Sequence, residues 1–295
     1  MKIIECVPNF SEGWSRRKIL KIAAVVTASP GVKLLDICMD KDHHRSVLTF
    51  IGPPESLQSA ALDACNRALE IIDMREHAGV HPRIGAVDVV PFIPLGDADM
   101  QDAIKAAHDF GREFSRKNQI PVYFYGEGAM DPWKRELSDI RRGGYEALKE
   151  RMKDPRWRPD AGPSLFQERS GATAVGARIP LIAYNINLCS EDLNLAQNIA
   201  KSIRQSGGGL LHVKALGIPL KSRRLVQVSM NLTDYRVTSI RTVFDCVRQK
   251  AAHQGIDILE SELIGLVPKA ALANVTAEYL KLRDFTDTKI LEAHF

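Results

Sequence analysis

The sequence predicts an α+β fold made of two α/β-sandwich subdomains with mixed sheets. Strand-like and helix-like segments alternate along the 295 residues, yet several strands follow one another without an intervening helix. A doubly wound parallel sheet would need a helix between each pair of strands, so mixed sheets with helices on one face fit better. A stretch rich in proline and glycine at 126–176 interrupts the regular pattern. We therefore expect one subdomain over residues 1–178 and a second over residues 179–295.

The first half is expected to combine strands with long helices. Pro30 and Gly31 end the first helix, and Pro121 precedes a short apolar strand. Within the irregular stretch only short helical pieces such as 144–152 are expected. The expected order is strand 3–7, helix 15–28, strands 32–37 and 46–51, helix 54–73, strand 86–93, helix 100–118 and strand 122–125.

The second half has the same character. Residues 226–232 alternate apolar and polar side chains, as a strand with one buried face does. Gly207 is expected to end the first helix of this half. The expected order is strand 181–188, helix 190–205, strands 211–216 and 225–232, helix 239–254, strand 261–266 and helix 269–282.

Composition is that of an ordinary globular protein. Hydrophobic residues make up 45% of the chain, charged residues 26%, and the formal net charge is +4. No basic run interleaves with aromatic residues, so we expect no nucleic-acid partner, although the charge suits weak attraction of a small anion. The five cysteines are far apart and lack a C-x-x-C pattern, which favours a reducing compartment. Since no signal-like segment or long apolar run is present, we expect a cytoplasmic protein that does not enter a membrane.

The most informative segment is 73–94, where two histidines and two arginines surround a break between a helix and a strand. Residues 69–76 favour a helix, and Gly79 is expected to stop it just past its last turn. Pro82 prevents the helix from resuming and pushes His81 toward an extended backbone. His81 is therefore predicted to lie at a fixed corner, the kind of place where reactive side chains are presented.

Two chemical roles compete for the histidines of this corner. His77 and His81 have the i, i+4 spacing of a zinc site, but the glycine and proline nearby keep both rings from sharing one helix face. The adjacent pair His43 and His44 would need further ligands to hold an ion. A general acid or base needs only one neutral imidazole with a pKa near the working pH. We favour that role for His81 and a structural role for His77, with no metal.

Charged residues flank the corner. Asp88 lies within an apolar strand and would be costly to bury unpaired, so we expect a salt link to Arg83 that pins the corner. The loop 40–45 ends in Arg45, which follows His44 and could fork onto a carboxylate. A solvated turn is the alternative for this loop.

A polar strand face is the candidate in the second half. In 226–232 the residues Gln227, Ser229 and Asn231 share one face. In 181–188 the residues Asn185 and Asn187 share a face. If these strands are neighbours, their amides and hydroxyls would suit the edge of a polar heterocycle, and Asp234 would extend the patch. Simple exposure to water is the alternative.

Common nucleotide and nucleophile motifs are absent from the sequence. There is no G-x-x-x-x-G-K-[ST], no complete dinucleotide fingerprint and no serine nucleophile elbow. The chain is therefore not expected to bind NAD or to hydrolyse ATP.

Several long motifs in order give the chain a resemblance to the formiminotransferase family. The resemblance is collinear over nearly the whole chain and ends where the transferase domain ends. It rests on ECVPNFSEG at 5–13, RSVLTFIGPPE at 45–55, IDMREHAGVHPRIGAVDVVPFIP at 72–94, DIRRGGYEAL at 139–148, GPSLFQERSGATAVGAR at 162–178, QVSMNLTDY at 227–235 and LIGLVP at 263–268.

The resemblance implies an enzyme of histidine degradation and one-carbon metabolism. Such an enzyme transfers a formimino group from N-formimino-L-glutamate to N5 of tetrahydrofolate, without metal or nucleotide. The implied fold has ferredoxin-like features, a folate cleft between the subdomains and a homodimer, and a separate cyclodeaminase is a conceivable partner. The catalytic histidine corresponds to His81, and Arg45 and Arg83 become candidates for holding substrate carboxylates. The folate loop corresponds to Gly162, Pro163, Ser164, Leu165, Phe166, Gln167, Glu168, Arg169, Ser170 and Gly171.

The chain departs from the family pattern at three positions. Val80 stands where the family usually has glutamate, His44 where it usually has asparagine, and Cys38 where it often has aspartate. These differences leave two alternatives open: transfer from another formimino or formyl amino acid such as glycine, and a folate-binding paralogue without activity. A metal-dependent amidine hydrolase is a third, less favoured hypothesis.

Overall fold

The computed structural model describes residues 2–79 and 81–294, which form two compact units. Unit 1 comprises residues 1–178 and unit 2 residues 179–295, and each has its own hydrophobic core. Both units combine helices with sheets, so the predicted α+β class is confirmed. The catalytic corner predicted around His81 lies entirely within unit 1.

Unit 1 is built on a mixed sheet. β1 and β2 both lie between β4 and β5 and form one strand position, interrupted at Val7 and Pro8. Pro8 has no N–H to donate, which fits a break in the ladder. β5, β7 and β6 run parallel, whereas the other pairs are antiparallel. The strands are β1 (Lys2–Cys6), β2 (Asn9–Phe10), β3 (Lys33–Asp40), β4 (Arg45–Gly52), β5 (Val87–Gly96), β6 (Val122–Gly126) and β7 (Thr173–Ala177).

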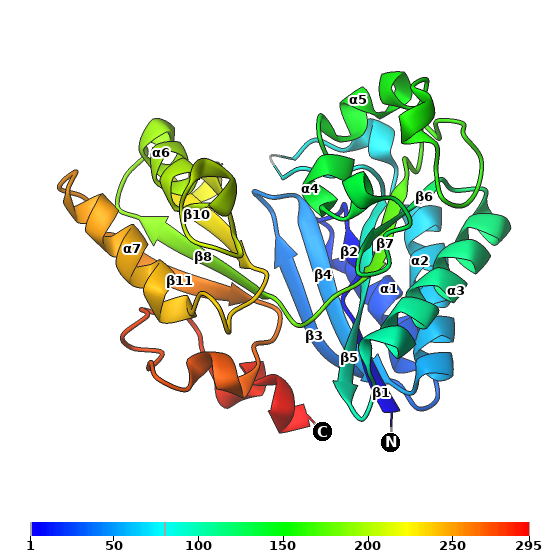
Figure 1. Cartoon of the computed structure of the whole chain (residues 1–295), viewed down its shortest axis with the longest axis horizontal. Helices are drawn as coiled ribbons and strands as arrows, with labels where there is room; N and C mark the ends of the chain where they lie inside the picture. Colours follow the sequence, from blue (N-terminus) through cyan, green and yellow to red (C-terminus); the bar gives the residue numbers. More distant parts are fainter. Residues whose placement is uncertain (1, 80, 295) are drawn as a thin grey trace. The chain divides into compact units, whose positions relative to one another are not determined.

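Three long helices pack against one face of this sheet, α1 (Arg16–Thr27), α2 (Pro54–Ile71) and α3 (Met100–Asn118) (Figure 1). They cover a core that includes buried phenylalanines of the strands and of α3. The helix α3 begins at a reciprocal capping box between Asp99 and Asp102, and its bounds match the prediction. The short helices α4 (Leu137–Ile140) and α5 (Gly144–Arg151) pack with a second, smaller cluster of buried side chains.

Unit 2 has an antiparallel sheet in the order β11-β8-β10-β9. The apolar residues of β8 and β10 pack with α6 and α7, which leaves their alternate polar residues on the other face. The elements are β8 (Ile182–Leu188), α6 (Leu193–Ile203), β9 (Val213–Leu220), β10 (Leu225–Leu232), α7 (Ile240–Ala252) and β11 (Ile258–Ile264).

Two segments differ most from the sequence prediction. The strand β7 lies in the stretch expected to be irregular; its small residues hide it, and Gly176 is needed because a Cβ would lie 2.4 Å from the Tyr125 carbonyl oxygen. The predicted helix 269–282 is wrong, since only Lys269–Leu272 forms a 3-10 turn. The chain then turns so that the Ser261 amide donates to the Lys281 carbonyl over 2.8 Å, and this backbone pairing replaces a helix.

The helix stop near the corner also lies elsewhere than predicted. The helix α2 ends at Ile71, and Asp73 caps a separate 3-10 turn, Met74–Glu76. Gly79 does not stop a helix; a Cβ there would lie 2.8 Å from the His43 carbonyl oxygen, so packing explains the glycine.

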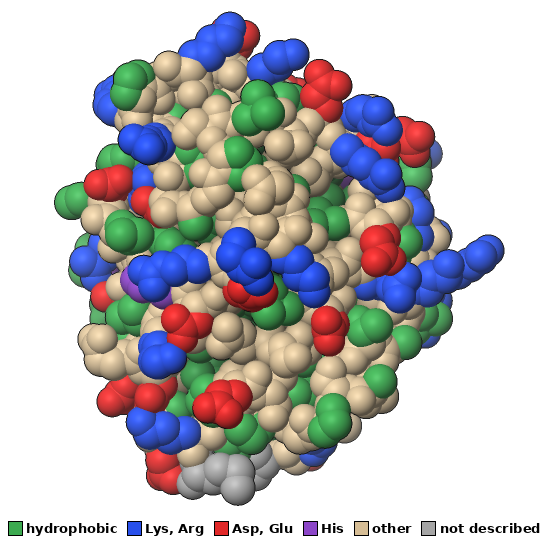
Figure 2. All heavy atoms as spheres, turned by 90° about the vertical axis from the view of Figure 1, so that its right-hand side faces the viewer, with side chains coloured by type: hydrophobic (Ala, Val, Ile, Leu, Met, Phe, Trp, Pro, Cys, Tyr) green, Lys and Arg blue, Asp and Glu red, His purple; other side chains and the backbone are tan. Residues whose placement is uncertain are grey.

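Surface charges are mixed. Figure 2 shows basic and acidic side chains interspersed on the face it presents, without segregation of one sign. Within residues 2–79 and 81–294, no helix is long and apolar enough to cross a membrane.

Candidate active site

His81 lies in the irregular segment that leads into β5. Its Nδ1 lies 2.8 Å from the carbonyl oxygen of Pro82, and its Nε2 lies 2.8 Å from Nη1 of Arg45. A carbonyl oxygen can only accept and a guanidinium can only donate. We therefore infer that Nδ1 carries the proton and that Nε2 presents its lone pair.

The electrostatic surroundings keep this imidazole neutral. Burial lowers the pKa of His81 well below its usual range, and the charges of Arg45, Arg141 and His43 lower it further. A neutral ring at pH 7 has the protonation state that a general base needs.

Arg45 begins β4 and directs its guanidinium at His81. Burial and the neighbouring Arg141 lower the pKa of Arg45 to about 10, so it is still a cation at neutral pH. Asp88 pairs with Arg141 and Asp40 with His43, and Arg45 forms no ion pair within the described part of the chain. The side chain is thus a cation suited to an anionic ligand.

His44 is the centre of a stack of rings. Its ring lies 4.4 Å from that of Trp14 and 4.1 Å from that of His77, nearly parallel to both. Its Nδ1 lies 2.8 Å from the Ala78 carbonyl oxygen, and its Nε2 lies 3.7 Å from Oε1 of Glu12. The backbone of His44 has φ 49°, a left-handed conformation that asparagine tolerates better than most residues. The stack ties the loop 40–45 to the corner, and the alternative of a solvated turn is wrong for its buried histidines.

Glu12 contacts the central ring of this stack, His44. Burial alone would raise the pKa of Glu12, but contacts with His44, Lys18 and the amides of Ser15 and Trp14 hold it well below its usual range. The carboxylate therefore stays charged.

Arg83 is engaged within the protein. Its Nη1 and Nη2 donate to the two carboxylate oxygens of Glu146 over 2.9 and 2.5 Å, and its Nε donates to Nδ1 of His77 over 3.1 Å. His77 in turn donates from Nε2 to the His44 carbonyl oxygen over 2.9 Å. His77 is thus held by structural hydrogen bonds, and a substrate role for Arg83 would require its fork to change partners.

The expected salt link between Asp88 and Arg83 is wrong. Asp88 pairs instead with Arg141, which follows α4, and it accepts a hydrogen bond from the Ile84 amide over 2.9 Å. Asp88 is 1% exposed, so its charge needs this partner. A salt link of Asp88 therefore does fix the corner, but its cation is Arg141 rather than Arg83.

A second histidine lies beside His81. The rings of His43 and His81 are 5.8 Å apart, and Nδ1 of His43 lies 2.7 Å from Oδ2 of Asp40 although off the line of a good hydrogen bond. In the described part of the chain, no three His, Cys, Asp or Glu residues are arranged to hold a metal ion.

The predicted folate loop, Gly162–Gly171, is attached to the corner at its C-terminal end. The Ala86 amide donates to the Ser170 carbonyl oxygen over 2.8 Å, and Gly171 forms a bridge with Gly85. Gly171 has φ +68°, and a Cβ there would lie 2.1 Å from the Ile84 carbonyl oxygen, so only glycine fits.

The other end of this loop is more exposed. Leu165 is 65% exposed, whereas Phe166 packs with Tyr145 at a ring distance of 5.3 Å. The loop therefore offers apolar side chains close to a segment that is fixed to the corner around His81. Its contact with folate stays a prediction, as does the cleft between the subdomains.

In unit 2 the predicted amide face contains carboxylates as well. Asn187 donates to Glu260 over 2.9 Å, and Asn185 donates to Glu262 over 3.2 Å. Gln227 donates to Oδ1 of Asn187 over 2.9 Å and to Glu262 over 3.0 Å. We call these five residues the amide–carboxylate face. The alternative of simple exposure is wrong for Asn187 and Gln227, which are both 0% exposed.

This face is rich in acceptors. Arg223 and Arg283 contact Glu260 from its edge, and Oε1 of Gln227 is buried without a hydrogen-bond partner. Ser229 and Asn231 are half-buried on the same side of β10. Asp234 stands apart, since its carboxylate pairs with Arg236 just after the strand.

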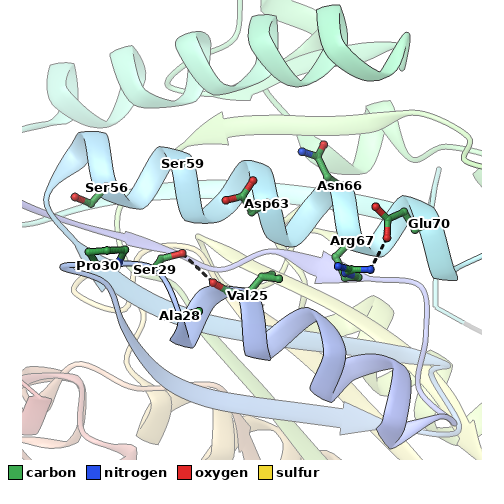
Figure 3. A pocket seen from close by; sticks show the side chains of 10 residues that line it. All are labelled: Val25, Ala28, Ser29, Pro30, Ser56, Ser59, Asp63, Asn66, Arg67 and Glu70. Carbon is green, nitrogen blue, oxygen red and sulfur yellow. Dashed lines mark hydrogen bonds and ion pairs between the residues drawn. The ribbon is translucent and has the colours of Figure 1, made fainter.

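A surface groove occurs elsewhere, between the end of α1 and the length of α2 (Figure 3). Its lining includes Ser29, Asp63 and Arg67, and Arg67 is paired with Glu70. None of the predicted site residues lines it, so it does not change the assignment of the site.

Sequence reasoning missed several partners in these networks. Glu12, Arg141 and Glu146 lie in motifs that carry the family resemblance, but nothing in a single sequence pairs them with His44, Asp88 and Arg83. A buried charge does signal that some partner exists. The carboxylates Glu260 and Glu262 alternate along β11 and could have been found from that spacing.

Comparison with known proteins identifies the family of the chain. The profile described as "Formiminotransferase domain, N-terminal subdomain" matches residues 3–178, and "Formiminotransferase domain" matches residues 183–292. The chain belongs to the formiminotransferase family. Among its relatives, a protein named glutamate formimidoyltransferase from Thermoplasma acidophilum is 44% identical, over 99% of this chain and 97% of the relative.

Two further relatives show how the family is organised. A glutamate formimidoyltransferase from Streptococcus pyogenes is 40% identical over 99% of this chain and 98% of its own length. A formimidoyltransferase-cyclodeaminase from Gallus gallus is 42% identical over 95% of this chain, but the match spans only 53% of that protein. The chain thus corresponds to about half of the fused relative.

Proposed function

We propose that this protein transfers a formimino group from N-formimino-L-glutamate to N5 of tetrahydrofolate, giving 5-formiminotetrahydrofolate and L-glutamate. The observation that carries the proposal is the neutral His81, whose Nε2 lies beside the cation Arg45, in a chain of the formiminotransferase family. The names of its relatives from Thermoplasma and Streptococcus support the donor.

The reaction needs one proton to move between two nitrogens. N5 of tetrahydrofolate attacks the formimino carbon and loses its proton, and the glutamate nitrogen gains a proton as its bond to that carbon breaks. A neutral imidazole can accept the first proton at Nε2 and return it to the leaving amine. Nδ1–H, held by the Pro82 carbonyl oxygen, fixes the ring and its tautomer during both transfers.

The two polar regions suit different parts of the substrates. Arg45 is matched to a carboxylate of the donor, since a guanidinium can donate two parallel hydrogen bonds to it. The amide–carboxylate face, which is rich in acceptors, is matched to the N–H groups at the edge of a pteridine ring. The loop Gly162–Gly171 supplies apolar side chains for the remaining folate.

Side-by-side turnover with two donors tests the proposal. The protein is incubated with tetrahydrofolate and either N-formimino-L-glutamate or N-formiminoglycine, and release of the free amino acid is followed. We expect formiminoglutamate to have the higher kcat/KM by about 10- to 100-fold, the value of one charge-assisted hydrogen bond to its second carboxylate.

The other outcomes separate the alternatives. A preference for formiminoglycine would replace the proposed donor. It would agree with the departures at His44, Cys38 and Val80, of which Val80 lies outside the described residues. Folate binding without turnover of either donor would identify a paralogue without activity. We further propose a cytoplasmic homodimer with no nucleic-acid or membrane partner, to be tested by light scattering, and a separate cyclodeaminase that would take its product.

A further inference from the structure

In the proposed reaction, Nε2 of His81 accepts the proton, but its lone pair already accepts a hydrogen bond from Arg45. Nη1 of Arg45 lies 2.8 Å from Nε2 of His81 and 3.4 Å from Nδ1, so its N–H donates mainly to Nε2. Because Nδ1 donates to Pro82, Nε2 is the one ring nitrogen that can accept a proton. A base whose lone pair accepts from a guanidinium cannot take a proton until that hydrogen bond breaks.

A bound anion would draw the guanidinium of Arg45 away from His81. Within the described residues it forms no ion pair, and the two nearby carboxylates already have partners, Asp88 with Arg141 and Asp40 with His43. A hydrogen bond from a guanidinium to a neutral imidazole is weaker than one to a carboxylate. A carboxylate ligand would therefore compete successfully for the guanidinium.

We propose that Arg45 caps the base and that a substrate carboxylate, by drawing the guanidinium to itself, frees Nε2 of His81 to accept the proton. Arg45 is thus a positioning residue that makes proton transfer depend on a bound carboxylate. This inference rests on the proposed function, since it assigns the order of events in that reaction. It also predicts which molecules activate the base: those that carry a carboxylate.

The balance of the step is simple. The N–H of Arg45 stays on Arg45 and changes its acceptor from Nε2 to a carboxylate oxygen. The proton lost by N5 then goes to Nε2, and from Nε2 it goes to the nitrogen of the departing amino acid. No other reactant is needed.

The groups that face His81 set what a titration will detect. Arg45, Arg141 and His43 disfavour the charged ring, and Asp88 and Asp40 offset the charges of Arg141 and His43. Movement of Arg45 to a carboxylate removes one of the three opposing charges and adds an anion. The pKa of His81 must then rise.

The test is an NMR titration of His81 in the full chain with ¹⁵N-labelled histidine, assigned with His81→Asn. Glutarate is the carboxylate probe, and glutaramide is its neutral control of the same length. We expect saturating glutarate to raise the pKa of His81 by about one unit or more, a tenfold change in proton affinity, and glutaramide to leave it unchanged. Equal responses to the two probes, or none to either, would overturn the proposal.

Variants sharpen the assignment to Arg45. In Arg45→Met the pKa of His81 should already be raised, and glutarate should cause no further rise. Arg67→Met, which removes an exposed arginine paired with Glu70 on α2, should respond to glutarate as the natural protein does. If Arg45→Met does not fold, Arg45→Lys should keep the response but need about tenfold more glutarate, because lysine lacks the planar fork.

The titration tests the cap and the donor assay tests the proposed function, so either claim can be contradicted while the other is supported. A rise with glutarate, in a protein that does not turn over formiminoglutamate, supports the cap and contradicts the proposed donor. Turnover of formiminoglutamate without a response to glutarate supports the proposed function and contradicts the cap.

Discussion

The corner of unit 1 and the amide–carboxylate face of unit 2 differ in the sign of the charge that they present. At the corner, Asp88 is buried and paired, and the remaining cation, Arg45, donates to a neutral imidazole. On the face of unit 2, Glu260 and Glu262 collect donors from amides and from two arginines, and an amide oxygen of Gln227 has no partner. The corner offers donors to a ligand, whereas the face offers acceptors.

The sharpest way to break this comparison is to remove the buried pair at the corner. Arg141→Met leaves the Asp88 carboxylate in an apolar strand without its cation, and we expect a loss of about 3–5 kcal/mol in the free energy of unfolding. Arg142→Met is the control, because Arg142 is exposed and pairs with Asp139 on the surface. Urea denaturation measures both; equal losses would contradict the importance of burial.

In unit 2 the same measurement should give a smaller loss. Asn187→Leu removes the acceptor of Gln227 and a donor to Glu260, and leaving these groups unsatisfied costs about 1–3 kcal/mol. Arg283→Met at the half-exposed edge of the face should cost about 1 kcal/mol or less. A larger loss in the free energy of unfolding for Arg283→Met than for Asn187→Leu would mean that ion pairs rather than amides hold this face together.

The effect of pH separates the two regions further. His77 and His81 have lowered pKa values, so the stability gained by keeping them neutral is fully present above pH ~6.5 and is lost as the pH falls below it. Glu5, whose buried carboxyl has its pKa raised to about 7, acts oppositely between pH ~4.3 and 7. The difference between natural protein and His81→Asn isolates His81. It should reach at most about 1.4 kcal/mol per pH unit below pH ~6.5, as followed by urea denaturation at pH 7, 6 and 5.5.

No change in that difference with pH would show that His81 is not held neutral. No described histidine of unit 2 is buried, so this acid sensitivity should be confined to unit 1.

The smallest expected effect concerns the ring stack. Trp14 is 64% exposed but lies over His44, and Trp14→Ala should cost about 0.5–1.5 kcal/mol through the lost stacking. Trp14→Phe keeps an aromatic ring and should recover most of that loss in the same denaturation assay. If the two variants are equally destabilised, the hydrogen bond from Nε1 of Trp14 to the Lys41 carbonyl oxygen matters more than the stack.

Local signals allowed most of the fold to be predicted. Helix α3 was predicted with its observed bounds because its apolar residues recur at helical spacing, and the structure adds a capping box at its start. Strand β7 was missed because Thr173–Ala177 is short and made of small residues, and its place is set by β5 and β6 on either side. The final helix was predicted in error because backbone pairing with Ser261, distant in sequence, outweighs local helix propensity.

The positions of the site residues could be predicted from the sequence better than the contacts that they make. Pro82 placed His81 at a corner, and the loop before β4 placed Arg45 near a strand start. The contact between Arg45 and His81 spans 36 residues and depends on how β4 and β5 lie in the sheet. The choice of Arg141 rather than Arg83 for Asp88 depends on α4, which only the folded chain brings close.

Turnover of His81→Ala is the most direct test of the central claim, that His81 relays the proton in formimino transfer. With tetrahydrofolate and formiminoglutamate, we predict that kcat falls about 10²- to 10⁴-fold, while folate binding measured by calorimetry stays close to that of the natural protein. Unchanged turnover with retained folate binding would contradict the claim.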